Sequence, residues 1–314
     1  EDLNAATDAQ IVNVEGVSAA TAFFLGMDIN LSSQSEGFFI AGSDLFDSIH
    51  GGMGVDSISA SGGADIIFDF VGADSVDGGP ESDTIFLSAT SADLNSADNT
   101  QIVSVEAVSA AGALSGVTIN LSSQTEGFLI TGSAFADTIT GGLGTDIINA
   151  GDGDDTINGF VGADTVDGGL GTDTIVLSAT SADLNTAANG QIRNVEAVSA
   201  SGAGAGVAID LSNQTEAFAI TGSTGVDTIT GGSGADSINA GDGDDTINGA
   251  QNDLLLDGGN DIDTLQVGAN FTSTGDAQIV NIQNVVLTAA VTLNLANQTE
   301  GFWIFGSASA DTIT

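Results

Sequence analysis

A long internal repeat is the feature of this sequence that most restricts its fold. A segment that begins at Leu31 recurs at equal intervals at Leu121 and Leu211, and again at Leu295 after a shorter interval. Long internal repeats form solenoids or arrays, in which each unit packs mainly on its neighbours. We therefore expect a window from a longer array. The expected units are 1–30 (partial), 31–120, 121–210, 211–294 and 295–314 (partial).

A finer period of nine residues lies inside each unit. The second unit reads, from Gly132, GSAFADTIT, GGLGTDIIN, AGDGDDTIN, GFVGADTVD and GGLGTDTIV, with Asp in the sixth place and Ile or Val in the eighth. One nonapeptide, GAQNDLLLD, departs from this rule because Leu254 stands in the sixth place and Asp253 is displaced by one, so we do not expect it to share a site that depends on the sixth residue. The nonapeptide blocks occupy 42–86, 132–176 and 222–266, and a single nonapeptide begins at Gly306.

The chemistry of one nonapeptide indicates a turn followed by a short strand. Thr156, Ile157 and Asn158 form the strand, and the middle side chain points inward because strand side chains alternate between faces. The six residues before it turn the chain, and glycine is favoured there because it accepts positive φ. Asp155 then offers a carboxylate in an oxygen-lined turn, which suits a hard ion such as Ca²⁺. Four further acids either complete coordination or face water: Asp152, Asp154, Asp242 and Asp244.

The charge balance of the chain points to the same ion. The sequence has 43 acidic residues against a single Arg193, no lysine and a formal charge of −42, yet 41% of it is apolar. Repulsion of this size opposes compaction unless cations are bound. The absence of lysine argues against nucleic acids and anionic lipids as partners. Disulfides are excluded because cysteine is absent, and no apolar run is long enough for membrane insertion.

The nonapeptides resemble the RTX family, whose motif is G-G-x-G-x-D-x-U-x. This resemblance implies Ca²⁺ as a cofactor at multiple sites and a parallel β-roll. We therefore expect an all-β protein, a parallel β-solenoid in which RTX β-roll blocks alternate with wider β-helical coils. The predicted metal ligands are the sixth-position aspartates Asp47, Asp56, Asp65, Asp74, Asp83, Asp137, Asp146, Asp155, Asp164, Asp173, Asp227, Asp236, Asp245, Asp263 and Asp311.

The segments between the blocks, such as 87–131, also read as β structure. This segment contains QIVSVEAVSA, GVTINLSS and GFLITGS, three runs with the alternation of strands, and SADLN favours a short helical turn. We interpret these segments as the wider coils. Aromatic residues gather near their junctions and are expected to fill the wider core: Phe38, Phe39, Phe128, Phe218, Phe302 and Trp303.

Catalysis has little support in the sequence, so we expect no enzyme and no catalytic residues. Tyrosine, cysteine and lysine are absent, and His50 occupies the outward ninth position of a nonapeptide. Paired carboxylates could indicate glycoside hydrolysis, but here they fall at the nonapeptide spacing and are explained as calcium ligands. Thr-x-Thr rows of the kind found on ice-binding faces are interrupted by Asn, Asp, Ser and Val.

The repeats and the RTX resemblance together favour a structural role outside the cell. We expect a calcium-stabilised segment of a large bacterial cell-surface or extracellular protein, similar to RTX adhesins and calcium-dependent S-layer proteins, in a lattice, filament or stalk. Self-association with copies of the same protein is the expected partnership. The alternative is a calcium-triggered folding and secretion module of a toxin or enzyme whose active domain lies outside this chain. The resemblance implies export of an unfolded chain that folds when it meets external calcium.

Overall fold

The structure, a computed structural model, describes residues 3–20 and 25–314 and consists mainly of short strands. Glu1 and Asp2 of the expected partial repeat lie outside the described residues. The helical turns are η1 (Leu3–Ala5), η2 (Leu94–Ser96), α1 (Ala182–Thr186) and η3 (Asp276–Gln278). The strands are β1 (Gly16–Ser18), β2 (Asp28–Asn30), β3 (Phe39–Ala41), β4 (Ser48–His50), β5 (Ser57–Ser59), β6 (Ile66–Phe68), β7 (Ser75–Asp77), β8 (Thr84–Phe86), β9 (Ile102–Val103), β10 (Ala107–Ser109), β11 (Thr118–Asn120), β12 (Leu129–Thr131), β13 (Thr138–Thr140), β14 (Ile147–Asp152), β15 (Thr156–Asn158), β16 (Thr165–Leu170), β17 (Thr174–Val176), β18 (Ile192–Arg193), β19 (Ala197–Ser199), β20 (Ala208–Asp210), β21 (Ala219–Thr221), β22 (Thr228–Thr230), β23 (Ser237–Asn239), β24 (Thr246–Asn248), β25 (Leu255–Asp257), β26 (Thr264–Val267), β27 (Phe271–Thr272), β28 (Ile279–Val280), β29 (Asn284–Leu287), β30 (Thr292–Asn294), β31 (Trp303–Phe305) and β32 (Thr312–Ile313).

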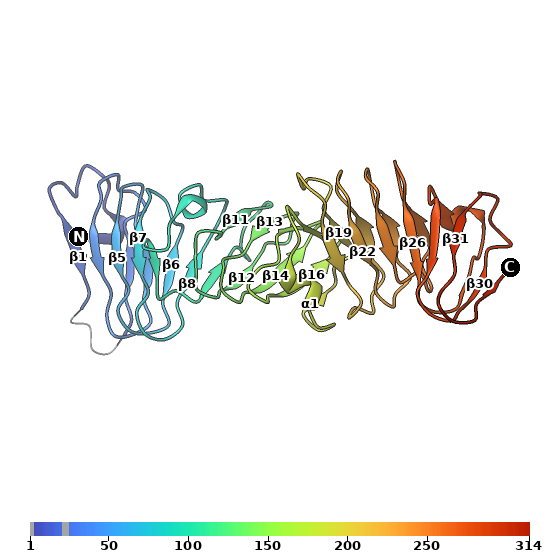
Figure 1. Ribbon diagram of the computed structural model, residues 1–314. Helices are drawn as coiled ribbons and strands as arrows, with labels where there is room; N and C mark the ends of the chain where they lie inside the picture. The colour runs from blue at the N-terminus through green and yellow to red at the C-terminus, as the bar shows by residue number, and fades with distance from the viewer. Residues whose placement is uncertain (1–2, 21–24) are drawn as a thin grey trace. The chain divides into compact units, whose positions relative to one another are not determined.

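The strands of the chain fall into two compact units. The first comprises residues up to 156 together with 164–171, and the second comprises 157–163 and 172–314. In the first unit one sheet has the order β1-β3-β5-β7-β9, and another runs through β2, β4, β6, β8, β10, β12, β14 and β16. Because alternate strands join the same sheet, two strands and two turns complete one coil (Figure 1). The repeat boundaries expected from the sequence stay a prediction.

The second unit follows the same rule. One sheet contains β17, β19, β21, β23, β25 and β28 in that order, another contains β20, β22, β24, β26, β29 and β31, and a short one contains β27, β30 and β32. Neighbouring strands run parallel throughout, as in the pairs β21 with β23 and β24 with β26. The fold is an all-parallel β-solenoid of about 15 turns, which confirms the predicted fold class.

The core of each coil is built from the middle residues of the three-residue strands. Ile49, Ile67 and Ile85 pair in register on β4, β6 and β8, and all three are buried. Each lies two nonapeptides after the one before it, so two nonapeptides make one turn of the solenoid. A stack of β-branched side chains at this spacing removes apolar surface from water along the whole sheet.

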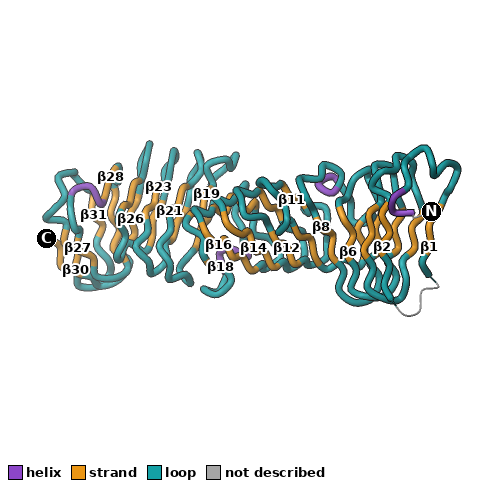
Figure 2. The backbone as a smooth tube through the Cα atoms, turned by 180° about the vertical axis from the view of Figure 1, so that it is seen from behind, coloured by secondary structure: helices purple, strands orange, loops and turns teal. Residues whose placement is uncertain are grey.

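The segments between nonapeptide blocks form wider coils of the same sheets, as expected. Val108 on β10 pairs with Ile85 on β8 and with Ile130 on β12, so both of these coils are longer than two nonapeptides. The extra residues hold the short helical turns, drawn in purple in Figure 2. In α1, the Ser181 side chain accepts the backbone N–H of Leu184 at 3.0 Å and caps the turn.

The aromatic residues near the junctions only partly fill the core. The buried ones are Phe38, Phe128 and Phe218, and Phe302 is half-buried. Phe39 and Trp303, however, are 54% and 75% exposed, so the expectation for these two was wrong. Each occupies the first position of a three-residue strand, and the alternation of strand side chains turns this position away from the face of the middle residue.

Candidate metal centre

The sixth-position aspartates lie inside the solenoid turns, each one residue before a strand. Their side chains are at most 3% exposed, although the sequence offers only Arg193 and His50 as cationic side chains. This burial holds for Asp47, Asp56, Asp65, Asp74, Asp83, Asp137, Asp146, Asp155, Asp164, Asp173, Asp227, Asp236, Asp245 and Asp263. The remaining predicted ligand, Asp311, is half-buried. Burial of charged groups is costly, so this arrangement needs compensation.

The buried carboxylates are connected in rows along each side of the solenoid. Asp65 accepts the backbone N–H of Asp47 through Oδ1 at 2.7 Å, and Asp83 accepts the N–H of Asp65 at 2.7 Å. On the other side Asp74 accepts the N–H of Asp56 at 2.9 Å. Carboxylates two nonapeptides apart therefore stack on consecutive coils and leave only one oxygen each for other partners.

Rows of the same kind connect the aspartates of the second unit. Asp245 accepts the N–H of Asp227 at 2.7 Å, and Asp263 accepts that of Asp245 at 2.9 Å. In the irregular nonapeptide Asp253 takes this role, because its Oδ1 accepts the N–H of Asp236 at 3.2 Å. Leu254, the residue in the sixth position, is 66% exposed. Asp253 is thus a candidate ligand that the fixed nine-residue register missed, although its displacement by one was visible in the sequence.

Residues outside the nonapeptides close the rows. The backbone N–H of Asp83 donates to Glu106 Oε2 at 2.8 Å, and that of Asp173 donates to Glu196 at 2.8 Å. In the last copy Gln283 accepts the N–H of Asp263 at 2.5 Å. The recurring glutamate of VEAV therefore has a hydrogen-bonding role, which a neutral amide oxygen fulfils as well.

The second oxygen separates two kinds of aspartate. The first aspartate of a block is satisfied by the protein, since the Asp47 carboxylate accepts the N–H of Ser43 at 2.5 Å and its hydroxyl at 3.0 Å. Ser133, Ser223 and Ser307 serve Asp137, Asp227 and Asp311 in the same way. In contrast, Oδ2 is buried and has no hydrogen-bond partner in Asp56, Asp65, Asp83, Asp245, Asp253 and Asp263.

Burial also changes the protonation of these carboxyl groups. Desolvation, with smaller contributions from neighbouring carboxylates, raises the pKa of Asp65 and of Asp245 to about 7. The pKa of Asp74 and of Asp253 is likewise raised to about 7, mainly by burial. Near neutral pH these groups therefore need either a proton or a positive ion beside them.

The glycines of the motif are required by the close packing of oxygens in the turn. A Cβ on Gly51 would lie 2.4 Å from Oδ2 of Asp56. Gly79 has a φ of +101°, and its Cβ would lie 1.8 Å from the carbonyl oxygen of Ser61 on the preceding coil. Any larger residue would displace the carboxylate in the first case and the backbone carbonyl in the second. The glycines of the motif thus allow both carboxylate and backbone carbonyl oxygens to lie inside the turn.

The chemistry of the turns fits calcium. The available donors are carboxylate and backbone carbonyl oxygens, the ligands that Ca²⁺ prefers. Across residues 3–20 and 25–314, no three acidic or histidine side chains converge as a metal-binding group. An ion in a turn would therefore be held by the partnerless Oδ2 of an aspartate together with carbonyl oxygens. The exposed Asp242 and Asp244 instead accept hydrogen bonds from Asn260 and Ile262.

Comparison with protein families identifies the repeats. The RTX calcium-binding nonapeptide repeat matches residues 50–85, 129–157, 140–175 and 221–253. These four matches to the RTX calcium-binding nonapeptide repeat each span several of the nonapeptides described above. RTX nonapeptide repeats bind Ca²⁺, so the matches agree with the partnerless carboxylates. No curated protein matches the chain. Among the described helices, none is long and apolar enough to cross a membrane.

Proposed function

We propose that this RTX solenoid is a calcium-stabilised structural segment of a large bacterial surface or extracellular protein, such as an S-layer, a filament or an adhesin stalk. The observation that carries the proposal is the rows of buried carboxylates with partnerless oxygens, repeated coil after coil. An ion site repeated along the coils stabilises a solenoid of any length, since each coil contacts mainly its neighbours. The sixth-position aspartates, with Asp253 in place of Leu254, are the proposed ligands.

The proposal includes folding outside the cell. In a compartment poor in calcium, mutual repulsion of the carboxylates keeps the chain open, and millimolar calcium closes the turns. This switch would also serve the alternative role, a folding and secretion module beside an active domain elsewhere in a longer protein. An upstream catalytic domain in the full-length gene would favour the alternative, and an anchoring domain would favour a surface segment.

Self-association is the part of the proposal that distinguishes an assembly from an isolated module. The formal charge of −42 makes the sides of the solenoid repel one another, so lateral contact requires bridging cations. We expect analytical ultracentrifugation at millimolar calcium to show species larger than the monomer, which magnesium at the same ionic strength does not produce. Electron microscopy of the same samples would separate filaments from sheets. A folded chain that stays monomeric across micromolar concentrations would contradict the assembly role.

A further inference from the structure

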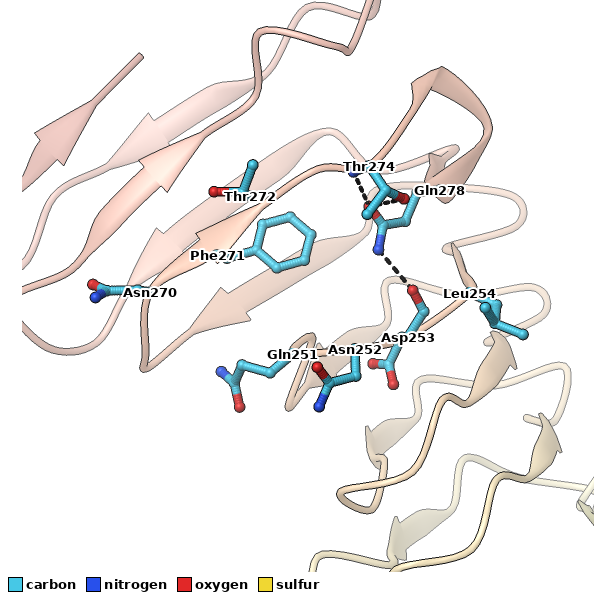
Figure 3. A pocket seen from close by; sticks show the side chains of 9 residues that line it. All are labelled: Gln251, Asn252, Asp253, Leu254, Asn270, Phe271, Thr272, Thr274 and Gln278. Carbon is cyan, nitrogen blue, oxygen red and sulfur yellow. Dashed lines mark hydrogen bonds between the residues drawn. The ribbon is translucent and has the colours of Figure 1, made fainter.

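A pocket in the second unit lies between the turn before β25 and the segment that contains β27 (Figure 3). Its volume is about 260 Å³, less than the roughly 300–1,000 Å³ of pockets that take drug-sized molecules. Gln251 and Asn252 line it from the turn, and Asn270, Phe271 and Thr272 line it from the other segment. The pocket therefore suits a small ligand, and the chemistry of its lining indicates which kind.

A hydrogen bond that joins the matching segments of the earlier repeats cannot form at this pocket. The Ser91 hydroxyl donates to the backbone carbonyl of Phe70, and the Ser181 hydroxyl donates to that of Phe160 at 2.5 Å. In the third repeat Phe271 takes the place of these serines and offers no hydroxyl. The two segments are therefore not joined there in this way, which leaves room for a ligand between them.

The turn that lines the pocket changes from apolar residues to amides in the third repeat. It reads FVG at 70–72 and at 160–162, but AQN at 250–252. Gln251 and Asn252 are both exposed, so their amides can exchange water for a ligand. The change therefore places two hydrogen-bonding side chains beside the space that the lost serine leaves.

Asn252 holds a backbone conformation that favours glycine. Its φ is +96°, close to the +108° of Gly72 and the +102° of Gly162 at the same place in the earlier repeats. A side chain is strained there, because residues that carry a Cβ rarely adopt such a φ. Strain of this kind concentrates at functional sites, so an asparagine in place of glycine points to a role for its amide.

The lining as a whole offers neutral hydrogen-bonding groups and one apolar ring. The amides of Gln251 and Asn252 each carry donors and an acceptor. Asn270 Oδ1 accepts a backbone N–H of a neighbouring coil at 2.7 Å, which fixes the side chain and leaves Nδ2 as a donor. Phe271 adds the ring, and the exposed Thr272 adds a hydroxyl.

A separate residue holds the two walls together. Gln278 donates through Nε2 to the backbone carbonyl of Asp253 at 2.6 Å, and its Oε1 accepts the N–H of Thr274 at 2.7 Å (Figure 3). The separation of the walls is therefore fixed before a ligand binds. Preorganisation of this kind lowers the entropy cost of binding.

We propose that this pocket binds one neutral hexose ring, with the amides of Gln251 and Asn252 bonded to its hydroxyls and its C–H face against Phe271. Sugar hydroxyls donate and accept hydrogen bonds, and so do the amides of the turn. The formal charge of −42 disfavours an anionic sugar. A cation finds no exposed carboxylate, because Asp253 is the only charged residue of the lining and is 2% exposed. A hexose has about 12 non-hydrogen atoms, which at the binding efficiency of ordinary ligands corresponds to a Kd of roughly 1–10 mM.

The test titrates the ¹⁵N-labelled chain at saturating calcium with glucose, galactose and mannose, up to roughly 100 mM, well above the expected Kd. With at least one of these sugars, the side-chain amide signals of Gln251 and Asn252 in the NMR spectrum should shift and saturate. Asn252→Gly and Gln251→Val install residues that the other repeats carry, so both variants should fold. Each should raise the Kd for the hexose several-fold.

Stability separates a binding role of Asn252 from a structural one. Because Asn252→Gly removes the strain, its urea midpoint of unfolding should equal or exceed that of the wild type while the affinity for the sugar falls. Asn213→Ser is the matched control, since it removes an exposed amide outside the pocket and installs the residue found at Ser33 and Ser123. Its Kd for the hexose should not change.

Three results would overturn the hexose site. They are the absence of saturable shifts with all three sugars, an equal Kd for Asn252→Gly and wild type, and tighter binding of glucuronate or spermidine than of glucose at these amides. Calcium-dependent folding, followed by circular dichroism in the same samples, tests the proposed function separately. Loss of the sugar result with that folding intact overturns the pocket alone, and a chain that binds hexose but folds equally without calcium contradicts the proposed function alone.

Discussion

Residues 42–86 and 87–131 build the same sheets of the first unit but satisfy their buried polar groups differently. The nonapeptide block completes each coil in two nonapeptides, with carboxylates such as Asp65, whose Oδ2 has no partner in the protein. The wider coil is several residues longer and places a neutral amide beside a buried backbone carbonyl. There the buried Gln124 donates through Nε2 to the carbonyl of Ala97 at 3.0 Å.

The difference shows how turn length decides whether a metal is needed. A wider coil has enough chain to bring amide donors and helical turns to its own carbonyls, and a partnerless neutral oxygen such as Gln124 Oε1 costs less than a buried charge. A nonapeptide turn has no such extra chain. Some of its aspartates accept a nearby donor, as Asp47 does from Ser43, but at Asp65 no donor reaches Oδ2, and the positive charge has to come from solution.

Removal of calcium is the strongest test of this comparison. With excess EGTA we expect most of the β signal in circular dichroism to be lost, because carboxylate repulsion opens the nonapeptide turns, and millimolar calcium should restore it. Hydrogen exchange on partial removal should show that amides of 42–86 lose protection before those of 87–131. A full β spectrum in chelator that calcium does not alter would contradict a structural role of the ion.

Acidification should partly replace calcium in the nonapeptide turns. The pKa of Asp65, Asp74 and Asp245 is raised from 3.8 to about 7, so the folded chain binds more protons than the unfolded chain between these values. The stability from protonation is therefore complete below pH 3.8 and is lost as the pH rises through 7. In excess EGTA the chain should therefore keep more of its β signal in circular dichroism at pH 5 than at pH 8. The opposite order would show that the carboxylates are not desolvated.

Single substitutions should distinguish the nonapeptide turns from the wider coils, with smaller effects than calcium removal or acidification. Asp65→Asn keeps the acceptor for Asp47 but removes the anionic ligand, and should raise the calcium midpoint of folding several-fold. Gln124→Ala, in the wider coil, should lower the free energy of unfolding by about 1–3 kcal/mol, because the carbonyl of Ala97 loses its donor. The number of bound ions should not change in Gln124→Ala. Calorimetric titration with calcium measures the midpoint and the number of bound ions, and urea unfolding at saturating calcium measures the free energy of unfolding. Equal midpoints for Asp65→Asn and wild type would contradict the ligand role.

The sequence by itself determined the solenoid and the turn positions of the aspartates, and the resemblance of its nonapeptides to a known repeat implied the parallel strands. Strand alternation and the nine-residue period are local properties, so the inward Ile85 and the turn at Asp83 follow from spacing alone. The same alternation, applied strictly, would also have placed Phe39 on the outside.

Only the tertiary structure decided which oxygens lack partners. The saturation of Asp47 by Ser43, the closure of a row by Glu106 and the substitution of Asp253 for Leu254 depend on groups that meet across coils. Coil length differs between the nonapeptide blocks and the wider coils, so a fixed sequence register cannot predict those meetings. Hydrogen bonding depends on small differences in distance and angle, which the stacking of one coil on the next determines.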